Sequence, residues 1–534
     1  MTKPKQRLAI TLFKSNVHSF NECLSGKPVE SEHEIKQQFN IEGKIYIGVP
    51  TEDSVDWLAF LQEGTDDAIK GLINISHRAA IIVKRGSRFL GLSFGYGQAL
   101  FDKKKVERNF GLKVVINSVD PKSLRSFDSA KLDDNIVLTR KQSSRGGNQT
   151  VFGSDIPTEL LCGVSGKSTE PLLGKSVAGK DQLLIAPNVD FTNIGDIIDL
   201  SLSQYAKTIY QNHFPWYDNI QIEQDSVTCD ALNVKLSTDL ATGVFDQFSF
   251  AAPEVYDPLV TQGFSFKPKG EILFDLEFDE FISYLQTLPS NDFSVDYLKG
   301  RKVYVRDDNG EEADKWSAFD CLSYETELSN QRYILFKGEW YKVSSDYFNE
   351  LVLFFNNRKR ETHAGTPSPL MVFPDFPRVK GHREGAYCID VANANPNLIS
   401  LDQKNVKVST TLSSVEPCDL LSFDGKFIHL KKKYGSSALS HLFAQGKVSA
   451  ELLKTEDRFR KGLRKKIRNE GKINQDIVPL GKIDPSNYKI IFGIIDNTPG
   501  VLKLPFFSMV NFQATGKYLE ALGYEVFITK IYYA

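Results

Sequence analysis

The stretch that decides the fold class of this chain is Glu416-Pro-Cys-Asp-Leu-Leu-Ser-Phe-Asp-Gly-Lys-Phe-Ile-His-Leu-Lys431. It places two short apolar runs on either side of Asp424-Gly425, a dipeptide typical of two-residue β-hairpin turns. Side chains alternate between the faces of a strand, so His429 and Lys431 share one face of the second strand. Asp419 leads into the first strand. The sequence therefore predicts a hairpin that brings a carboxylate close to a histidine and a lysine.

Helix signals lie on both sides of this hairpin. Glu384 opens a predicted helix upstream of it. Downstream, Ser436 and Ser437 begin a short predicted helix that carries Gln445 and ends at Gly446. A second predicted helix, residues 449–468, has apolar side chains on one face and bases over much of the rest. The expected order is helix, hairpin, helix and basic helix.

A carboxylate beside a lysine suits metal-dependent cleavage of phosphodiesters. Carboxylates hold Mg²⁺, which polarises the phosphate and lowers the pKa of a bound water, while a lysine orients that water or stabilises charge. The segment resembles the PD-(D/E)XK nuclease superfamily, in which an acid on one strand is followed by D/E-x-K on the next. Asp419 matches the first acid and Lys431 the lysine. His429 departs from the pattern, since a neutral imidazole is a weaker ligand for Mg²⁺ than a carboxylate.

This resemblance implies a restriction-endonuclease-like core, a mixed sheet flanked by helices, and it implies roles for individual residues. The acids Glu384, Glu416 and Asp419 would bind Mg²⁺ or Mn²⁺. Lys431 would activate water or stabilise the pentavalent phosphate, His429 would replace the second acid, and Gln445 would support the site. The expected catalytic residues are therefore Asp419, His429, Lys431, Gln445 and Glu384. Expected phosphate contacts are Lys432, Lys433, Arg458, Arg460, Lys461, Arg464, Lys465 and Arg468.

Charge is distributed unevenly along the chain. Residues 425–475 contain fourteen bases and four acids, whereas residues 217–300 contain fifteen acids and four bases. A basic surface attracts polyanions, so we expect the C-terminal region to bind nucleic acid, with DNA favoured over RNA. The acidic segment could shield that surface or bind a protein partner.

The composition excludes several classes of protein. With 534 residues, 41% hydrophobic and 25% charged, the chain is expected to be globular and to contain several domains. No apolar run approaches the ~18 residues of a membrane span, and the apolar run at 8–13 is too short for a signal peptide. The six cysteines lack the spacing of metal ligands and suit the reducing cytosol. We expect a cytoplasmic protein without membrane contact.

The pattern along the chain predicts a mixed α/β protein with three regions: an N-terminal α/β domain (1–130), a middle α/β region (131–300) and the nuclease-like domain (301–534). Expected strands in the first region include 8–13, 44–49, 79–84, 88–94 and 111–115. Residues 140–180, rich in Gly, Ser and Lys, are predicted to form a long loop or a boundary region. Gly163–Ser168 and Gly174–Asp181 resemble phosphate-binding loops. The first is two residues short and the second ends in Asp instead of Ser or Thr, so neither is expected to bind nucleotide.

Short stretches spread over the whole chain also carry a resemblance. They are Phe94-Gly-Tyr-Gly97, Asn109-Phe-Gly-Leu112, Arg125-Ser126 with Asp128, Phe214-Pro-Trp-Tyr-Asp-Asn219, Ser437-Ala-Leu-Ser-His-Leu-Phe-Ala-Gln-Gly446 and Leu504-Pro-Phe-Phe507. With these the chain resembles a family of sporadically distributed bacterial proteins associated with defence and mobile-element loci. The resemblance implies a role in anti-phage defence but does not indicate which reaction the protein would catalyse.

The function that we expect is that of a metal-dependent nuclease in bacterial anti-phage or mobile-element defence. Two alternatives stay open. A catalytically inactive nucleic-acid-binding or sensor subunit is favoured by His429, and a protein-interaction scaffold would dock through residues 217–300. Polar clusters in the N-terminal half, such as Arg125 with Asp128, are better explained by loop structure. If they are functional, bases flanked by Gly and Ser suit a phosphate or nucleotide effector.

Overall fold

The structure is a computed structural model of the chain. It describes residues 6–55, 57–131, 137–153, 159–245, 247–254, 256, 261–288, 293–307, 310–360, 371, 373–379, 383–407, 414–433, 437–471 and 474–534. The chain is a mixed α/β protein with several separate sheets, as expected from its sequence. Two compact units are present. Unit 1 comprises Met1–Ala130 and Leu138–Asp218, and unit 2 comprises Asn219–Ala534 with the short segment Lys131–Val137. The division into regions 1–130, 131–300 and 301–534 stays a prediction.

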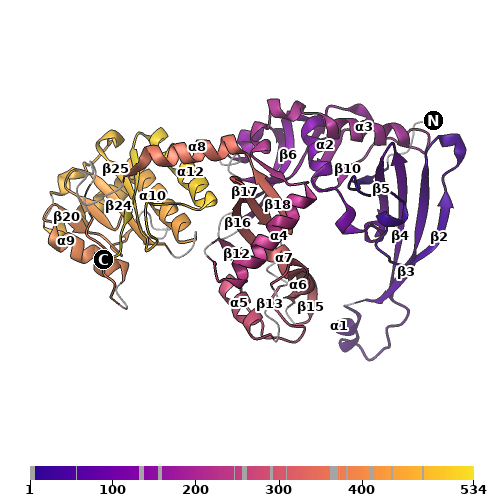
Figure 1. Ribbon diagram of the computed structural model, residues 1–534, viewed down its shortest axis with the longest axis horizontal. Coiled ribbons are helices and arrows are strands. Elements are labelled where there is room, and N and C mark those ends of the chain that lie inside the picture. Colours follow the sequence, from indigo (N-terminus) through magenta and orange to yellow (C-terminus); the bar gives the residue numbers. More distant parts are fainter. Residues whose placement is uncertain are drawn as a thin grey trace. The chain divides into compact units, whose positions relative to one another are not determined.

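Unit 1 is built on one ten-stranded sheet in the order β2-β3-β4-β5-β1-β10-β9-β8-β6-β7 (Figure 1). Its described pairings are antiparallel. The strands are β1 (Leu8–Leu12), β2 (Val29–Glu34), β3 (Gly43–Ser54), β4 (Ile73–Arg85), β5 (Arg88–Gly95), β6 (Val119–Lys131), β7 (Val137–Gly147), β8 (Leu160–Ser168), β9 (Ser176–Gly179) and β10 (Leu183–Ile185). The expected strands at 8–13, 44–49, 79–84 and 88–94 are confirmed. A short helix, α1 (Leu58–Glu63), lies in the connection between β3 and β4.

The expected strand at 111–115 is wrong, because these residues belong to helix α2 (Phe110–Ser118). Almost every residue of α2 is buried, so its apolar run lacks the periodicity that normally distinguishes a helix from a strand. The helix lies very close to the sheet: a β-carbon at Gly179 would be 2.0 Å from the carbonyl oxygen of Gly111. The α3 helix (Ile194–Ala206) packs against α2.

The long loop expected at 140–180 is also wrong. Its glycines and serines lie within β7, β8 and β9, where small side chains let the strands approach α2 and each other. Gly163 to Ser168 lie in β8 and do not form a turn between a strand and a helix. Neither glycine-rich segment therefore has the strand–loop–helix setting of a phosphate-binding loop.

Unit 2 begins with two smaller sheets. A five-stranded sheet has the order β11-β18-β17-β16-β12, and a three-stranded sheet the order β13-β14-β15. The strands are β11 (Ile220–Ile222), β12 (Phe248–Phe250), β13 (Gly263–Ser265), β14 (Lys302–Arg306), β15 (Glu312–Ser317), β16 (Leu322–Leu328), β17 (Gln331–Phe336) and β18 (Glu339–Val343). The accompanying helices are α4 (Ser226–Ala241), α5 (Phe278–Gln286), α6 (Val295–Gly300), α7 (Ala318–Cys321) and α8 (Ser345–Arg358).

The C-terminal part of unit 2 is a six-stranded mixed sheet, β19-β26-β25-β24-β23-β20 (Figure 1). Its strands are β19 (Lys359–Arg360), β20 (Leu398–Ser400), β23 (Leu420–Ser422), β24 (Lys426–Lys432), β25 (Lys489–Ile495) and β26 (Glu525–Ile531), and β21 (Val406–Lys407) pairs separately with β22 (Ser414–Val415). β20, β23 and β24 are antiparallel neighbours, whereas β24, β25 and β26 run parallel. Helix α9 (Glu384–Ala394) packs on one face through Tyr387 and Val391.

Helix α10 (Ser437–Thr455) contacts β24 and β25 and also packs on α12 (Phe506–Leu522). The expected helix end at Gly446 is wrong, since α10 continues through this residue to Thr455. Gly446 is needed for packing instead, because a β-carbon there would lie 2.5 Å from the ring of Phe492 on β25. The basic segment is a separate helix, α11 (Asp457–Glu470). Ser436, expected to begin the first helix, lies outside the described residues.

Candidate metal and nucleic-acid site

The predicted hairpin is confirmed, but its strands are joined by three residues, 423–425, instead of the expected two. β23 and β24 pair with Leu420 opposite Ile428, and Gly425 has a φ of +82° in the turn between them. Asp419 lies at the entrance to β23, where its backbone N–H donates to Ile428 at 3.0 Å and its carbonyl accepts from Leu401 at 2.8 Å. The backbone of Asp419 is therefore held between β24 and the end of β20.

Two carboxylates continue the hydrogen-bond ladder of β24 after β23 has diverged from it. The Leu430 N–H donates to Oδ2 of Asp419 at 2.6 Å, and the Lys432 N–H donates to Oε1 of Glu384 at 2.7 Å. The other oxygen of Glu384 accepts from Nζ of Lys431 at 3.1 Å. Side chains thus take the place of a strand partner, and they place an acid, a lysine and a second acid along one strand edge.

Asp419 also belongs to a group of three carboxylates at the same end of the sheet. One oxygen each from Asp402, Glu416 and Asp419 lies within 4.8 Å of the others, and all three residues are partly buried. We call this set the acidic triad. The Gln403 N–H donates to Glu416. The triad also meets the first turn of α9, because a β-carbon at Gly385 would be 2.4 Å from Oδ2 of Asp402.

The triad is electrostatically strained when no cation is bound to it. Burial, together with the negative charges of Glu416, Asp402 and Glu384, raises the pKa of Asp419 to about 8. Burial likewise raises the pKa of Glu416; the nearby Asp402 adds to that shift, whereas the Gln403 N–H and the Lys431 ammonium oppose it. A divalent cation would relieve this repulsion. Hard carboxylate oxygens are the donors that Mg²⁺ and Mn²⁺ accept, so the residues fit such an ion.

The structure brings together two of the three expected metal ligands, Glu416 and Asp419. Glu384, the third, begins α9 as predicted and lies beside Lys431 instead of within the triad. Its place in the triad is taken by Asp402, which the sequence analysis did not single out. The available signal was an acid that immediately follows the short run Leu398–Leu401. Because β20 and β23 are antiparallel, an acid after β20 and an acid before β23 lie at the same end of the sheet.

His429 is not part of the triad. Its side chain is buried between β24 and α10, near Gly446 and 6.0 Å from the ring centre of Phe492. Burial lowers the pKa of His429 to about 4, so the imidazole is neutral at pH 7. Its Nε2 atom has no hydrogen-bond partner among the described residues. Gln445, on the next helix, is exposed and precedes Gly446 directly.

Some of the bases expected to contact phosphate have structural partners. Arg460 is buried and donates to the Leu453 and Lys454 carbonyls at the end of α10. Arg464 donates to the carbonyls of Gln475 and Val478 and to Asp476. These contacts hold α11 in place, so neither guanidinium is free for phosphate.

Lys432 and Lys433 are also engaged. Nζ of Lys432 lies 4.3 Å from the ring centre of Phe376, and Nζ of Lys433 lies 3.3 Å from the carboxylate of Asp496. Four other bases on α11 are exposed: Arg458, Lys461, Lys465 and Arg468. Their spacing of three and four residues puts them on one face, opposite the buried residues Phe459, Leu463 and Ile467. We call these four bases the α11 stripe.

Residues 8–532 match the family of unknown function DUF6119, and because this match covers nearly the whole chain, the protein belongs to that family. No curated protein and no solved structure shows significant similarity to the chain. Among the described residues, no helix combines the length and the apolar character needed to cross a membrane.

Proposed function

We propose that the C-terminal part of unit 2 is a metal-dependent nuclease that hydrolyses phosphodiester bonds of DNA, or less readily of RNA. The observation that carries the proposal is the acidic triad beside the Lys431–Glu384 pair, all at one end of a mixed sheet. We further propose that this activity serves bacterial anti-phage or mobile-element defence, which the resemblance noted in the sequence supports.

The order of elements supports the proposal. α9, β20, β23, β24, α10 and β25 come in this order along the chain: a helix, three antiparallel strands, a helix and a parallel strand. The β21–β22 pair lies between β20 and β23, and α11 lies between α10 and β25. This agrees with the mixed sheet flanked by helices that a restriction-endonuclease-like core implies. Asp419 and Lys431 occupy the positions of the first acid and of the lysine in that resemblance.

Asp402, Glu416 and Asp419 would hold Mg²⁺ or Mn²⁺, which when bound supplies Lewis-acid polarisation of a phosphate and a lower pKa for water. Side chains of the protein would supply the other functions of the site. The Lys431 ammonium, oriented by Glu384, stabilises negative charge on the phosphate or orients the attacking water. The α11 stripe provides point charges for the sugar–phosphate backbone, since such contacts position nucleic acid without reading its sequence.

The decisive experiment compares wild-type protein with Lys431→Ala and Asp419→Asn on plasmid DNA, single-stranded DNA and RNA. Each substrate is incubated with Mg²⁺, with Mn²⁺ and with EDTA. We expect cleavage that needs a divalent ion and that falls at least about 100-fold in either variant, comparable to losses seen when charge-stabilising groups are removed. Lys489→Ala is the matched control, because Lys489 lies on the neighbouring strand and pairs with Glu525.

Absence of cleavage of all three substrates with either metal would refute the nuclease proposal. Equal loss in Lys489→Ala would show that the variants act through the fold and not through the site. Far-ultraviolet circular dichroism of each variant shows whether a loss of cleavage comes from a damaged fold or from the altered site.

The second candidate is a catalytically inactive subunit that binds nucleic acid. Its supporting observation is His429, which occupies the position of the second acid but is buried, neutral and separate from the triad. Binding of DNA at low salt without cleavage under any metal condition is the result that this candidate predicts. Docking of a protein partner on residues 217–300 stays a third proposal, favoured if nucleic acid does not bind at all.

A further inference from the structure

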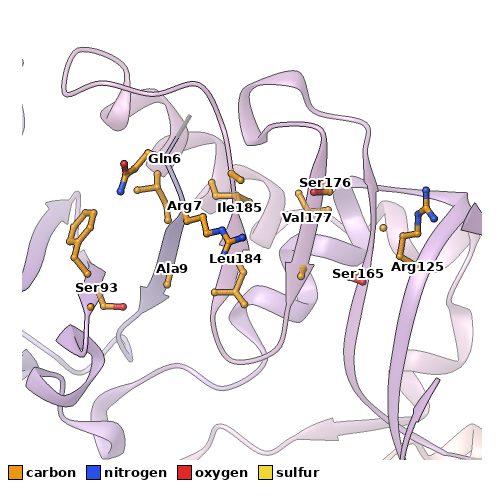
Figure 2. A pocket seen from close by; sticks show the side chains of 16 residues that line it. Gln6, Arg7, Ala9, Ser93, Arg125, Ser165, Ser176, Val177, Leu184 and Ile185 are labelled. Carbon is orange, nitrogen blue, oxygen red and sulfur yellow. The ribbon is translucent and has the colours of Figure 1, made fainter. Parts of the chain in front are cut away.

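A cavity of about 870 Å³ lies on one face of the unit 1 sheet, over β5, β1, β10, β9 and β8 (Figure 2). The opposite face of these strands is buried against α2 and α3. Over β4 and β5, the cavity's own face is covered by a second apolar cluster that includes Phe13, Tyr46 and Phe101. This cover ends at β5, so the neighbouring strands leave an open bay, which we call the sheet bay.

The floor of the sheet bay is a continuous row of mostly small side chains. Strand register pairs Ser93 with Ala9, Ala9 with Leu184, Leu184 with Ala178, and Ala178 with Ser165. All five residues line the cavity, and Leu184 is 49% exposed. Small side chains across five strands leave room for a flat molecule, whereas the long polar side chains usual on an exposed sheet face would fill that space.

The charge of the lining is positive only. Among the 16 residues that line the cavity, the charged ones are Arg7 and Arg125, and none is acidic. One Arg125 N–H donates to the carbonyl of Ser144 at 2.5 Å, which ties this guanidinium to β7. Arg7 is exposed and directly precedes β1. Guanidinium groups recognise phosphates and carboxylates through paired N–H donors, so the bay complements an anion.

The distance between the two arginines restricts the size and shape of a ligand that contacts both of them. Arg7 and Arg125 lie four strand steps apart in the sheet, which corresponds to roughly 19 Å between their backbones at about 4.8 Å per step. Because the two backbones are this far apart, an extended anion spans the pair of guanidiniums better than a compact one. The floor between them carries the hydroxyls of Ser165 and Ser176 and the apolar side chains of Ala178 and Leu184. An elongated molecule with a flat ring, hydroxyl groups and more than one phosphate fits this combination.

We propose that unit 1 binds a nucleotide with two or more phosphates in the sheet bay. The base lies on the apolar floor of Ala178 and Leu184, and the phosphates meet Arg7 and Arg125. This inference is independent of the nuclease proposal, because every lining residue belongs to unit 1 and the acidic triad belongs to unit 2.

The test is calorimetric titration of the full chain in EDTA with four probes: ATP, NAD⁺, inorganic tripolyphosphate and a ten-residue thymidine oligonucleotide. We expect ATP or NAD⁺ to bind most tightly. Changing both arginines (Arg7→Gln with Arg125→Gln) should weaken that binding at least about tenfold, since each charge-assisted contact is worth roughly a factor of ten or more. Ala178→Leu, which raises the floor, should weaken it similarly without changing charge.

Two controls keep the result specific. Arg145→Gln removes an exposed guanidinium from β7 that does not line the bay, and Lys489→Ala removes a base from unit 2; both should bind as wild type. Lack of ATP and NAD⁺ binding, or binding unaffected by the bay variants, would overturn the proposal. If tripolyphosphate binds as tightly as ATP, the bay is a site for polyphosphate. If the oligonucleotide binds most tightly, the bay is a surface for nucleic acid. Either result rejects a nucleotide as the ligand.

Discussion

Glu384 and Lys431 form an ion pair at the edge of β24, with Nζ 3.1 Å from Oε2, while the second oxygen of Glu384 accepts the N–H of Lys432. One carboxylate therefore holds both the side chain of Lys431 and the backbone that follows it. Because Glu384 is the first residue of α9, this contact joins the start of a helix to the end of a strand. The lysine is oriented by an acid outside the acidic triad, which leaves the three triad carboxylates available for a cation.

The Glu384–Lys431 pair should contribute little to stability and much to the position of the lysine. About a third of the Lys431 side chain is exposed, so solvent screens the pair, and a double-mutant cycle with Glu384→Gln and Lys431→Met should give a coupling below about 1 kcal/mol. Urea unfolding of the four proteins measures it. A coupling of several kcal/mol would mean that the pair is a structural element and that Lys431→Ala cannot be interpreted as a site variant.

Asp419 should make the metal-free protein less stable as pH rises. Its pKa is about 8 in the folded chain, whereas an aspartate in an unfolded chain has a pKa of about 3.9. The folded state therefore binds this proton more tightly, and the stabilisation is complete below about pH 4 and lost as pH rises towards about 8. The unfolding free energy of wild type, minus that of Asp419→Asn, should fall between pH 5 and pH 9 in EDTA.

The same variant should abolish stabilisation by metal. Because a divalent ion neutralises the triad, Mg²⁺ or Mn²⁺ should raise the melting temperature of wild type at pH 8 and change that of Asp419→Asn much less. Asp424→Asn serves as the control, since Asp424 pairs with Lys426 in the hairpin turn. Equal shifts in all three proteins would place the ion elsewhere.

His429 should have the opposite effect on pH dependence. Burial lowers its pKa to about 4, below the value of about 6.5 in an unfolded chain, so its contribution is present above pH 6.5 and lost as pH falls to about 4. His429→Leu should therefore gain stability relative to wild type from pH 7 to pH 5. His441→Gln, an exposed histidine on α10, should show no such gain. Retained cleavage in His429→Leu would show that the imidazole is a packing residue, whereas its loss would restore a direct role.

The α11 stripe should determine the salt dependence of nucleic-acid binding. Replacing Arg458, Lys461, Lys465 and Arg468 with Gln should weaken DNA binding at least about tenfold and reduce the slope of log K against log salt by up to about 0.9 per lost phosphate contact. Replacing Lys315 and Lys342, which are exposed elsewhere in unit 2, should change neither. Arg464→Gln should instead lower stability, because it removes the contacts to the Gln475 and Val478 carbonyls.

Where a few neighbouring residues determine a structural element, the sequence was enough to predict that element. The Asp424-Gly425 turn predicts the hairpin, and Glu384 begins α9 as expected. Amphipathic spacing likewise predicts the basic helix, although its first residue is later than expected. These features depend on a few neighbouring residues: a turn that needs a positive φ and a helix with one apolar face.

Other features depend on residues far apart in the chain, and only the tertiary structure decided them. Antiparallel pairing of β20 with β23 brings Asp402 to Asp419, a contact that no local pattern encodes. Gly446 looks like a helix end but lies inside a helix, where Phe492 packs against it. The run at 111–115 belongs to a helix whose residues are almost all buried, so no amphipathic period marks it in the sequence. The sequence by itself determined the local elements and the types of charge available. Long-range packing decided which carboxylates share a site, because that depends on which strands become neighbours.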